Sequence, residues 1–180
     1  MADLLSQLTD NPVRFPDLCL SLSRPLIHLL AAQLPHAPAK ILSIGSGSGL
    51  LENALLHVTK HTCDLYGVEV SSAVNRHLPE DRLLQVAGTG LLHPDAIFAE
   101  LLMFVYPRQP SLLASYLSAF SHGMLEKVIW LGPRIDWPDA EPLLSAVFNH
   151  VEILDGPYLP EYELLVIAKE LKTVARPSSN

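Results

Sequence analysis

Three glycines and three serines are concentrated in the stretch KILSIGSGSGLLE, residues 40–52, directly behind a short apolar run. This pattern is typical of a strand that ends in a glycine-rich turn and continues as a helix, because glycine reaches backbone angles closed to other residues. Backbone amides at the start of such a helix favour an anionic or nucleotide-like ligand. The stretch therefore predicts a site for a nucleotide or a related molecule.

The spacing of this turn separates the classes of nucleotide-binding protein. It reads G-x-G-x-G, with Leu50 where a dinucleotide fingerprint carries its last glycine or alanine, so a dehydrogenase is disfavoured. No lysine follows the glycines, which excludes a P-loop. Glu69 ends the next apolar run, LYGVEV, and a carboxylate there can accept hydrogen bonds from both ribose hydroxyls of a nucleoside.

From residue 40 onward, apolar strand-like runs alternate with helical patterns, which predicts a doubly wound, mostly parallel α/β sheet with helices on both faces. The spacing predicts strands over 40–45, 64–70, 82–88, 101–107, 127–132, 151–156 and 162–171, and helices over 49–61, 72–78, 93–100, 110–123 and 140–150. Only the turn GPYLPE separates the last two strands, which is too short for a crossover helix. These two strands should therefore pair antiparallel.

The chain before residue 40 is expected to be helical. Residues 16–34 read as a helix with a break near Pro25, and a proline-marked linker follows. This apolar segment could cover a pocket or make the contact of a homodimer. The predicted organisation is an N-terminal helical cap over 1–39, a main domain over 40–171 and a flexible tail over 172–180.

The composition of the chain indicates which kinds of partner it binds. A formal charge of −7, with 12 lysines and arginines spread along the chain, disfavours nucleic acid and favours a small-molecule substrate. No apolar run is long enough for a membrane span, and the first residues lack a secretory pattern, so we expect a cytoplasmic protein without a membrane partner. The two cysteines are far apart, and no His, Cys, Asp or Glu cluster has metal-binding spacing, so no metal is expected.

The segments ILSIGSGSG and LYGVEVS resemble the first motif and the acidic strand end of class I S-adenosylmethionine-dependent methyltransferases. The likeness extends in element order over most of residues 40–171. It implies a seven-stranded sheet of order 3-2-1-4-5-7-6, an antiparallel terminal hairpin, and S-adenosylmethionine as cofactor.

The resemblance also assigns the residues of the cofactor site. It places Gly45, Gly47 and Gly49 at the methionine portion and the sugar edge, Glu69 at the ribose and Val70 against the adenine. Thr89 takes the place of an aspartate that meets the adenine amino group in the family. The full set implied to bind the cofactor is Ser43, Gly45, Ser46, Gly47, Gly49, Glu69, Val70, Gly88 and Thr89.

Two positions depart from the family pattern. Ser43 stands where the family carries an acid two positions before the first glycine. Glu52, at the start of the next helix, could supply a negative charge nearby, but an ordinary first-turn glutamate is the favoured interpretation. The fourth strand ends in VYPRQP, where amino-methylating relatives carry Asn/Asp-Pro-Pro-aromatic.

Candidate catalytic residues come from the loops that should face the substrate. Tyr106 and Arg108 follow the fourth strand, His93 follows the third, and His28 lies on the N-terminal helix that would roof the pocket. Arg108 and Arg134 could together clamp a substrate carboxylate.

The leading hypothesis is a small-molecule methyltransferase. The alternatives are a methyltransferase-like protein that catalyses a cofactor-independent cyclisation or isomerisation, and a non-catalytic partner subunit.

Overall fold

The computed structural model describes residues 6–172, which form a seven-stranded sheet and a separate two-stranded hairpin. The sheet order is β5-β4-β3-β6-β7-β9-β8, and β9 is the strand that runs against its neighbours. Counted along the chain, this order is 3-2-1-4-5-7-6, so the predicted topology is confirmed. The strands are β3 (Lys40–Ile44), β4 (Asp64–Glu69), β5 (Leu83–Gln85), β6 (Ala99–Val105), β7 (Lys127–Pro133), β8 (Phe148–Leu154) and β9 (Glu163–Leu171).

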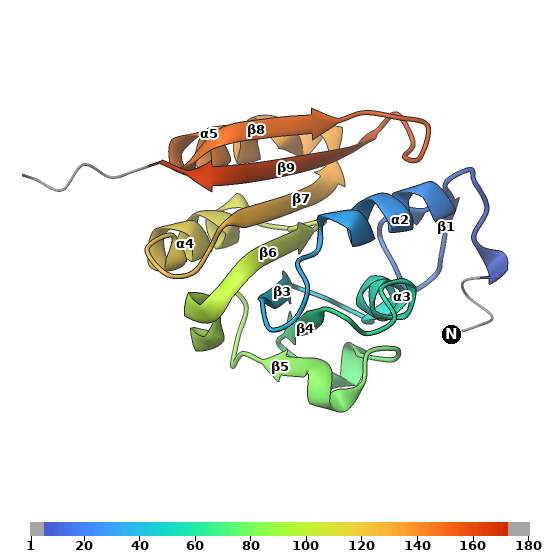
Figure 1. Ribbon diagram of the computed structural model, residues 1–180, viewed down its shortest axis with the longest axis horizontal. Helices are drawn as coiled ribbons and strands as arrows, with labels where there is room; N and C mark the ends of the chain where they lie inside the picture. Colours follow the sequence, from blue (N-terminus) through green and yellow to red (C-terminus); the bar gives the residue numbers. More distant parts are fainter. Residues whose placement is uncertain (1–5, 173–180) are drawn as a thin grey trace, which may run out of the picture.

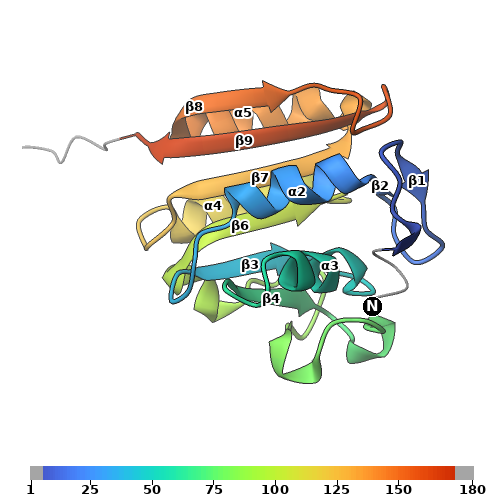
Figure 2. The ribbon, with the colours of Figure 1, turned by 45° about the vertical axis from the view of Figure 1, so that its right-hand side comes forward.

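Two layers of helices cover the sheet (Figures 1 and 2). Helices α2 (Arg24–Gln33) and α3 (Leu50–Val58) pack on one face, and α4 (Pro110–Phe120) and α5 (Trp137–Val147) pack on the other. Alternate residues of each central strand supply the two cores, because successive side chains of a strand point to opposite faces. In β6, Leu101 and Met103 join the α2/α3 core, whereas Leu102 and Phe104 join the α4/α5 core.

The N-terminal helix is shorter than predicted. Strands β1 (Val13–Arg14) and β2 (Ser21–Leu22) form an antiparallel hairpin where the sequence predicts helix, so that prediction is wrong for residues 16–23. The helix begins only at Arg24, because Ser23 caps it by accepting a hydrogen bond from the Leu26 amide. Pro25 lies in the first turn, where a missing amide proton costs nothing, and it starts the helix rather than breaking it.

Two further predicted helices are replaced by single 3₁₀ turns. The segment between β4 and β5 contains η1 (Ser72–Val74) and η2 (Glu80–Arg82), and the segment before β6 contains η3 (Pro94–Phe98). Asn75 bonds both the amide and the carbonyl of Leu78 through its side chain, which competes with helical pairing. Because no α-helix forms between β4 and β5, no helix covers the residues that directly follow the end of β4.

The N-terminal segment shares its core with the sheet. Leu20, Leu22 and Leu30 are fully buried in the same cluster as Ile41 of β3 and Leu65 of β4. Residues 173–180 of the predicted tail lie outside the described residues. None of the helices in the described range 6–172 is long and apolar enough to cross a membrane.

The link between β3 and α3 is a glycine turn in the left-handed region. Gly45, Gly47 and Gly49 have φ angles of +75°, +56° and +74°. Gly49 caps α3, and a Cβ atom there would lie 2.6 Å from Leu78 Cβ and 2.8 Å from Asn75 Oδ1. The third glycine is therefore required both by its backbone angle and by the segment that packs against it.

We expect Gly49→Ala to destabilise the fold more than Gly45→Ala. Both changes place a side chain at a positive φ, which costs roughly 1–2 kcal/mol. Only Gly49→Ala also forces a steric overlap, since nothing lies within 4 Å of a Cβ at Gly45. The added overlap should cost about 1–3 kcal/mol of the free energy of unfolding, measured by urea titration. Equal losses in the two variants would contradict this account of the turn.

Candidate functional site

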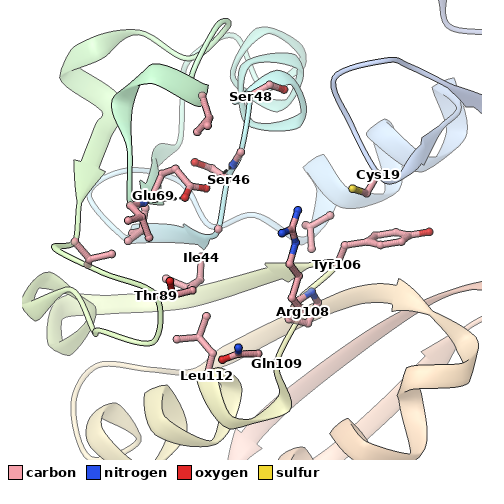
Figure 3. Close-up of a pocket in the computed structure, with 18 of the residues that line it drawn as sticks. Cys19, Ile44, Ser46, Ser48, Glu69, Thr89, Tyr106, Arg108, Gln109 and Leu112 are labelled. Atoms are coloured by element: carbon pink, nitrogen blue, oxygen red, sulfur yellow. Dashed lines mark hydrogen bonds between the residues drawn. The ribbon is translucent and has the colours of Figure 1, made fainter.

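A cavity of about 550 Å³ opens at the carboxyl ends of β3, β4 and β6 (Figure 3). The strand order reverses at β3, which is where open α/β sheets bind their ligands. The cavity is lined by the glycine turn, the end of β4, the loops after β5 and β6, and the loop of the β1–β2 hairpin. Of the residues predicted to bind a cofactor, those on its wall are Gly45, Ser46, Gly47, Glu69, Val70, Gly88 and Thr89.

The glycine turn presents bare backbone to the cavity. A Cβ atom at Gly45 or Gly47 would meet nothing within 4 Å, so a ligand can approach the main chain there. Ser46, between them, is buried, and its Oγ has no hydrogen-bond partner among the described residues. A buried hydroxyl without a partner carries a desolvation cost that a polar ligand group would remove.

Glu69 stands beside the turn at the end of β4. Its Oε2 accepts a hydrogen bond from the Gly47 amide at 3.0 Å, and its Oε1 accepts one from the Val70 amide at 2.8 Å. These bonds fix the carboxylate on the cavity wall, and each oxygen keeps a further lone pair for a donor. The arrangement suits a ligand with two neighbouring hydroxyl groups.

Exposed apolar side chains form the next part of the wall. Val70, Val74 and Leu91 are 41%, 44% and 54% exposed, and all three line the cavity. Together they offer an apolar slot next to Glu69, of the kind that a flat aromatic ring would cover.

Ser43 and Glu52 form a buried polar pair below the turn. The Ser43 hydroxyl donates to Glu52 Oε1 at 2.6 Å, and both residues are at most 2% exposed. Glu52 lines the cavity, and its Oε2 has no partner among the described residues. The interpretation of Glu52 as an ordinary first-turn glutamate is therefore wrong, because the helix turns its side chain inward to the serine that replaces the family's acid.

Burial dominates the ionisation of Glu52. Desolvation raises the pKa of this carboxyl from 4.5 to about 7; the Ser43 hydrogen bond opposes the shift, and the charge of Glu69 adds to it. Glu52 therefore changes its charge close to neutral pH, inside a cavity wall.

The opposite wall is built from the loop after β6 and the hairpin loop. Tyr106, Arg108 and Gln109 line it from the loop after β6, and Asp17 and Cys19 line it from the hairpin loop. In Figure 3 the Arg108 side chain points toward the glycine turn, whereas the Tyr106 ring points away from it. The Arg108 guanidinium is thus placed to meet an anionic group on a ligand.

A buried carboxylate holds Tyr106 in this position. The Tyr106 hydroxyl donates to Glu163 Oε1 at 2.6 Å, and Glu163 also accepts the Ser21 amide and hydroxyl. Tyr106 has a φ of +50°, which is rare for a bulky residue and needs such fixed contacts. Burial and the Glu163 charge raise the pKa of the Tyr106 phenol, so this group stays protonated. Glu163 therefore connects the hairpin to the strand end that carries Arg108.

The other predicted catalytic groups lie away from the cavity wall. His28 is exposed on α2, which packs on the sheet face instead of roofing the pocket. His93 caps η3, its Nδ1 accepting a hydrogen bond from the Asp95 amide at 3.2 Å. Their catalytic roles stay predictions. The structure does not bring Arg134 to Arg108, because Arg134 pairs with Asp155 at 2.6 Å outside this cavity.

Several wall residues escape the sequence reasoning. The hairpin loop with Asp17, Leu18 and Cys19 falls inside a segment predicted to be helical. Glu163, which holds the wall residue Tyr106, lies within a run that looks like plain strand. Glu52 was within reach: an acid missing from a strand end, with a glutamate one helical turn after the glycines, is a signal for relocation. Within residues 6–172, no group of three or more His, Cys, Asp or Glu side chains could hold a metal ion.

Comparisons with known proteins agree with this fold. The sequence matches no protein-family model and no curated protein. A SAM-dependent O-methyltransferase from Thermotoga maritima superposes with a TM-score of 0.62 at 10% identity, covering 86% of this chain and 68% of that one. Precorrin-6y C5,15-methyltransferase from Geobacter metallireducens gives a TM-score of 0.60 at 10% identity, covering 87% and 91%.

A third similar structure is a 16S rRNA methyltransferase from T. thermophilus, in complex with AdoMet and guanosine. It has a TM-score of 0.57 at 14% identity, covering 93% of this chain and 46% of that one. The chain thus has the Rossmann-like class I fold of S-adenosylmethionine-dependent methyltransferases, as its sequence motifs predict.

We expect Glu52 to make the stability of the free protein depend on pH. Between about pH 4.5 and 7 the folded chain keeps a proton on Glu52 that the unfolded chain has lost. The free energy of unfolding should therefore fall as the pH rises through this range, by about 3 kcal/mol in total. Below and above the range, Glu52 should cause no further change with pH.

Glu52→Gln should abolish this contribution, since glutamine keeps the shape of the side chain and cannot ionise. Urea unfolding of both proteins at pH 4.5, 6 and 8 measures the difference. Parallel pH profiles for the wild type and the variant would show that the Glu52 carboxyl is not perturbed.

Proposed function

We propose that the protein binds S-adenosylmethionine in the cavity and transfers its methyl group to a small-molecule acceptor. One observation carries the proposal. One cavity is lined by an open left-handed glycine turn, the Glu69 carboxylate, and Ser46 and Glu52, whose buried Oγ and Oε2 have no hydrogen-bond partner within residues 6–172.

The residues present fit the cofactor part by part. Glu69 would accept hydrogen bonds from the ribose hydroxyls, and Val70, Val74 and Leu91 would cover the adenine. Gly88 and Thr89, after β5, also line the cavity and would meet the edge of the ring. The turn of Gly45, Ser46 and Gly47 would take the methionine portion.

The bound cofactor supplies a methyl group on a sulfonium, which is transferred by in-line displacement. The contributions of the chain are alignment of the acceptor and exclusion of water. Arg108 and Gln109 orient the acceptor from the loop after β6, and Asp17 and Cys19 of the hairpin loop help to exclude water. Tyr106 serves as a fixed wall group, because its hydroxyl is protonated and committed to Glu163.

The charge around the cavity supports a small acceptor. Among the described residues, the wall carries Glu69, Asp17 (paired with Arg76) and the partly protonated Glu52 as acidic groups, and Arg108 as a basic group. A polyanion such as RNA would meet this acidic wall on a chain of formal charge −7, without the clustered lysines and arginines that bind phosphates. Similar structures include an rRNA methyltransferase and a precorrin methyltransferase, so fold likeness leaves both classes open and the charge favours the small molecule.

We expect Glu69→Ala to weaken binding of S-adenosylmethionine by about 2–3 kcal/mol, because one or two charge-assisted hydrogen bonds are lost. Isothermal titration calorimetry measures the loss. Glu141→Ala, an exposed glutamate on α5, is the matched control and should leave the affinity unchanged. Wild-type protein that binds neither S-adenosylmethionine nor its demethylated product would refute the proposal.

The acceptor class is tested with methyl-labelled S-adenosylmethionine. The protein is incubated separately with the low-molecular-weight filtrate, the total RNA and the protein fraction of a cell extract. We expect label in the filtrate, and an Arg108→Ala variant should transfer less because its acceptor is held more weakly. Label confined to RNA or protein would overturn the small-molecule assignment while leaving cofactor binding intact.

A further inference from the structure

The fold does not require a buried polar pair at the positions of Ser43 and Glu52. The carboxyl of Glu52 is 2% exposed, is held by the Ser43 hydroxyl at 2.6 Å through Oε1, and leaves Oε2 without a partner in the described part of the chain. An apolar side chain would fill this place in a helix facing a sheet at lower cost. The residue also lines the cavity, so its carboxyl lies next to the space that a ligand would fill.

We propose that Glu52 is the site for the cationic amino group of the bound cofactor, and that binding there expels a proton from Glu52. Ser43 is the positioning residue, because its hydrogen bond fixes the carboxyl toward the turn. The inference rests on the proposed function, since it assigns one part of the same ligand to one group of the same cavity.

The charged groups around Glu52 explain why ligand binding would expel its proton. Glu69 on β4 faces it and disfavours a second negative charge, and the fixed Ser43 hydroxyl on β3 favours one. Asp17 in the hairpin loop and Arg108 after β6 are the other charged groups on the cavity wall. Without a ligand, burial keeps the pKa of Glu52 near 7, so much of the protein carries a protonated carboxyl at neutral pH.

A cation next to Oε2 reverses that balance. An ammonium group donates to the open oxygen and stabilises the carboxylate, so the proton of Glu52 leaves to solvent as the ligand binds. Each ligand that binds protein with a protonated Glu52 releases one proton, and each ligand that binds protein with an ionised Glu52 releases none. Affinity should therefore rise with pH up to about 7 and then level off.

Two nucleosides separate this site from the rest of the cavity. S-Adenosylhomocysteine carries the amino-acid portion without the sulfonium charge, and methylthioadenosine keeps the adenosine and the thioether but has no amino-acid portion. Both are titrated into the wild type, Glu52→Gln, Ser43→Ala and the exposed control Glu141→Gln. Calorimetry at pH 6 and pH 8, in two buffers of different ionisation enthalpy, gives the affinity and the number of protons released.

We expect S-adenosylhomocysteine to release about one proton from the wild type at pH 6 and far fewer at pH 8. Glu52→Gln should release none beyond the background that the ligand's own amine gives, and should bind about 10- to 100-fold more weakly at pH 8. Methylthioadenosine should bind the wild type and Glu52→Gln equally, without proton release. In Ser43→Ala the proton release should persist to higher pH, because the bond that favours the carboxylate is gone.

The outcomes separate the inference from the proposed function. Binding of both nucleosides with the same proton count and the same affinity in the wild type and Glu52→Gln overturns the Glu52 assignment alone. Failure of the wild type to bind either nucleoside overturns the proposed function as well. Should Glu52→Gln not fold, the pH dependence of proton release in the wild type and Ser43→Ala still decides the question.

Discussion

The site depends on one backbone constraint, the left-handed glycine turn between β3 and α3. Three positive φ angles reverse the chain within a few residues, which sets the first turn of α3 directly above the end of β3. This geometry brings Glu52 back over Ser43 and places Ser46 at the cavity wall. It also presents the Gly47 amide to Glu69, so that the carboxylate at the end of the neighbouring strand is fixed by the same turn.

A second fixed point holds the other wall. Glu163 is the first residue of the antiparallel β9, and its buried carboxyl bonds Tyr106 after β6 and Ser21 in the hairpin. The terminal hairpin of the sheet thereby positions loops that come from the first and middle parts of the chain. Glu163 and Glu52 are both buried, yet of these two glutamates only Glu52 keeps an oxygen without a partner in the described residues.

Sequence reasoning predicted the sheet order and named many of the residues that line the cavity beside the glycine turn, because both follow from local patterns. Apolar runs, the glycine spacing and the short final turn are visible without tertiary contacts. It missed the hairpin at residues 13–22, where Ser23 and Pro25 start the helix late, and the loop beyond β4, where Asn75 competes for backbone bonds. The burial of Glu52 and the contacts of Glu163 were not predicted for another reason: both arise from packing beside partners that are distant in sequence or on the next element.

The central claim is that this cavity holds S-adenosylmethionine by its ribose at Glu69 and by its amino group at Glu52. A crystal structure of the protein with S-adenosylhomocysteine tests it most directly. The account predicts density in the cavity with the ribose hydroxyls on the Glu69 carboxylate, the adenine between Val70 and Leu91, and the amino nitrogen within hydrogen-bond distance of Glu52 Oε2. A ligand bound elsewhere, or bound here with its amino group turned away from Glu52, would contradict it.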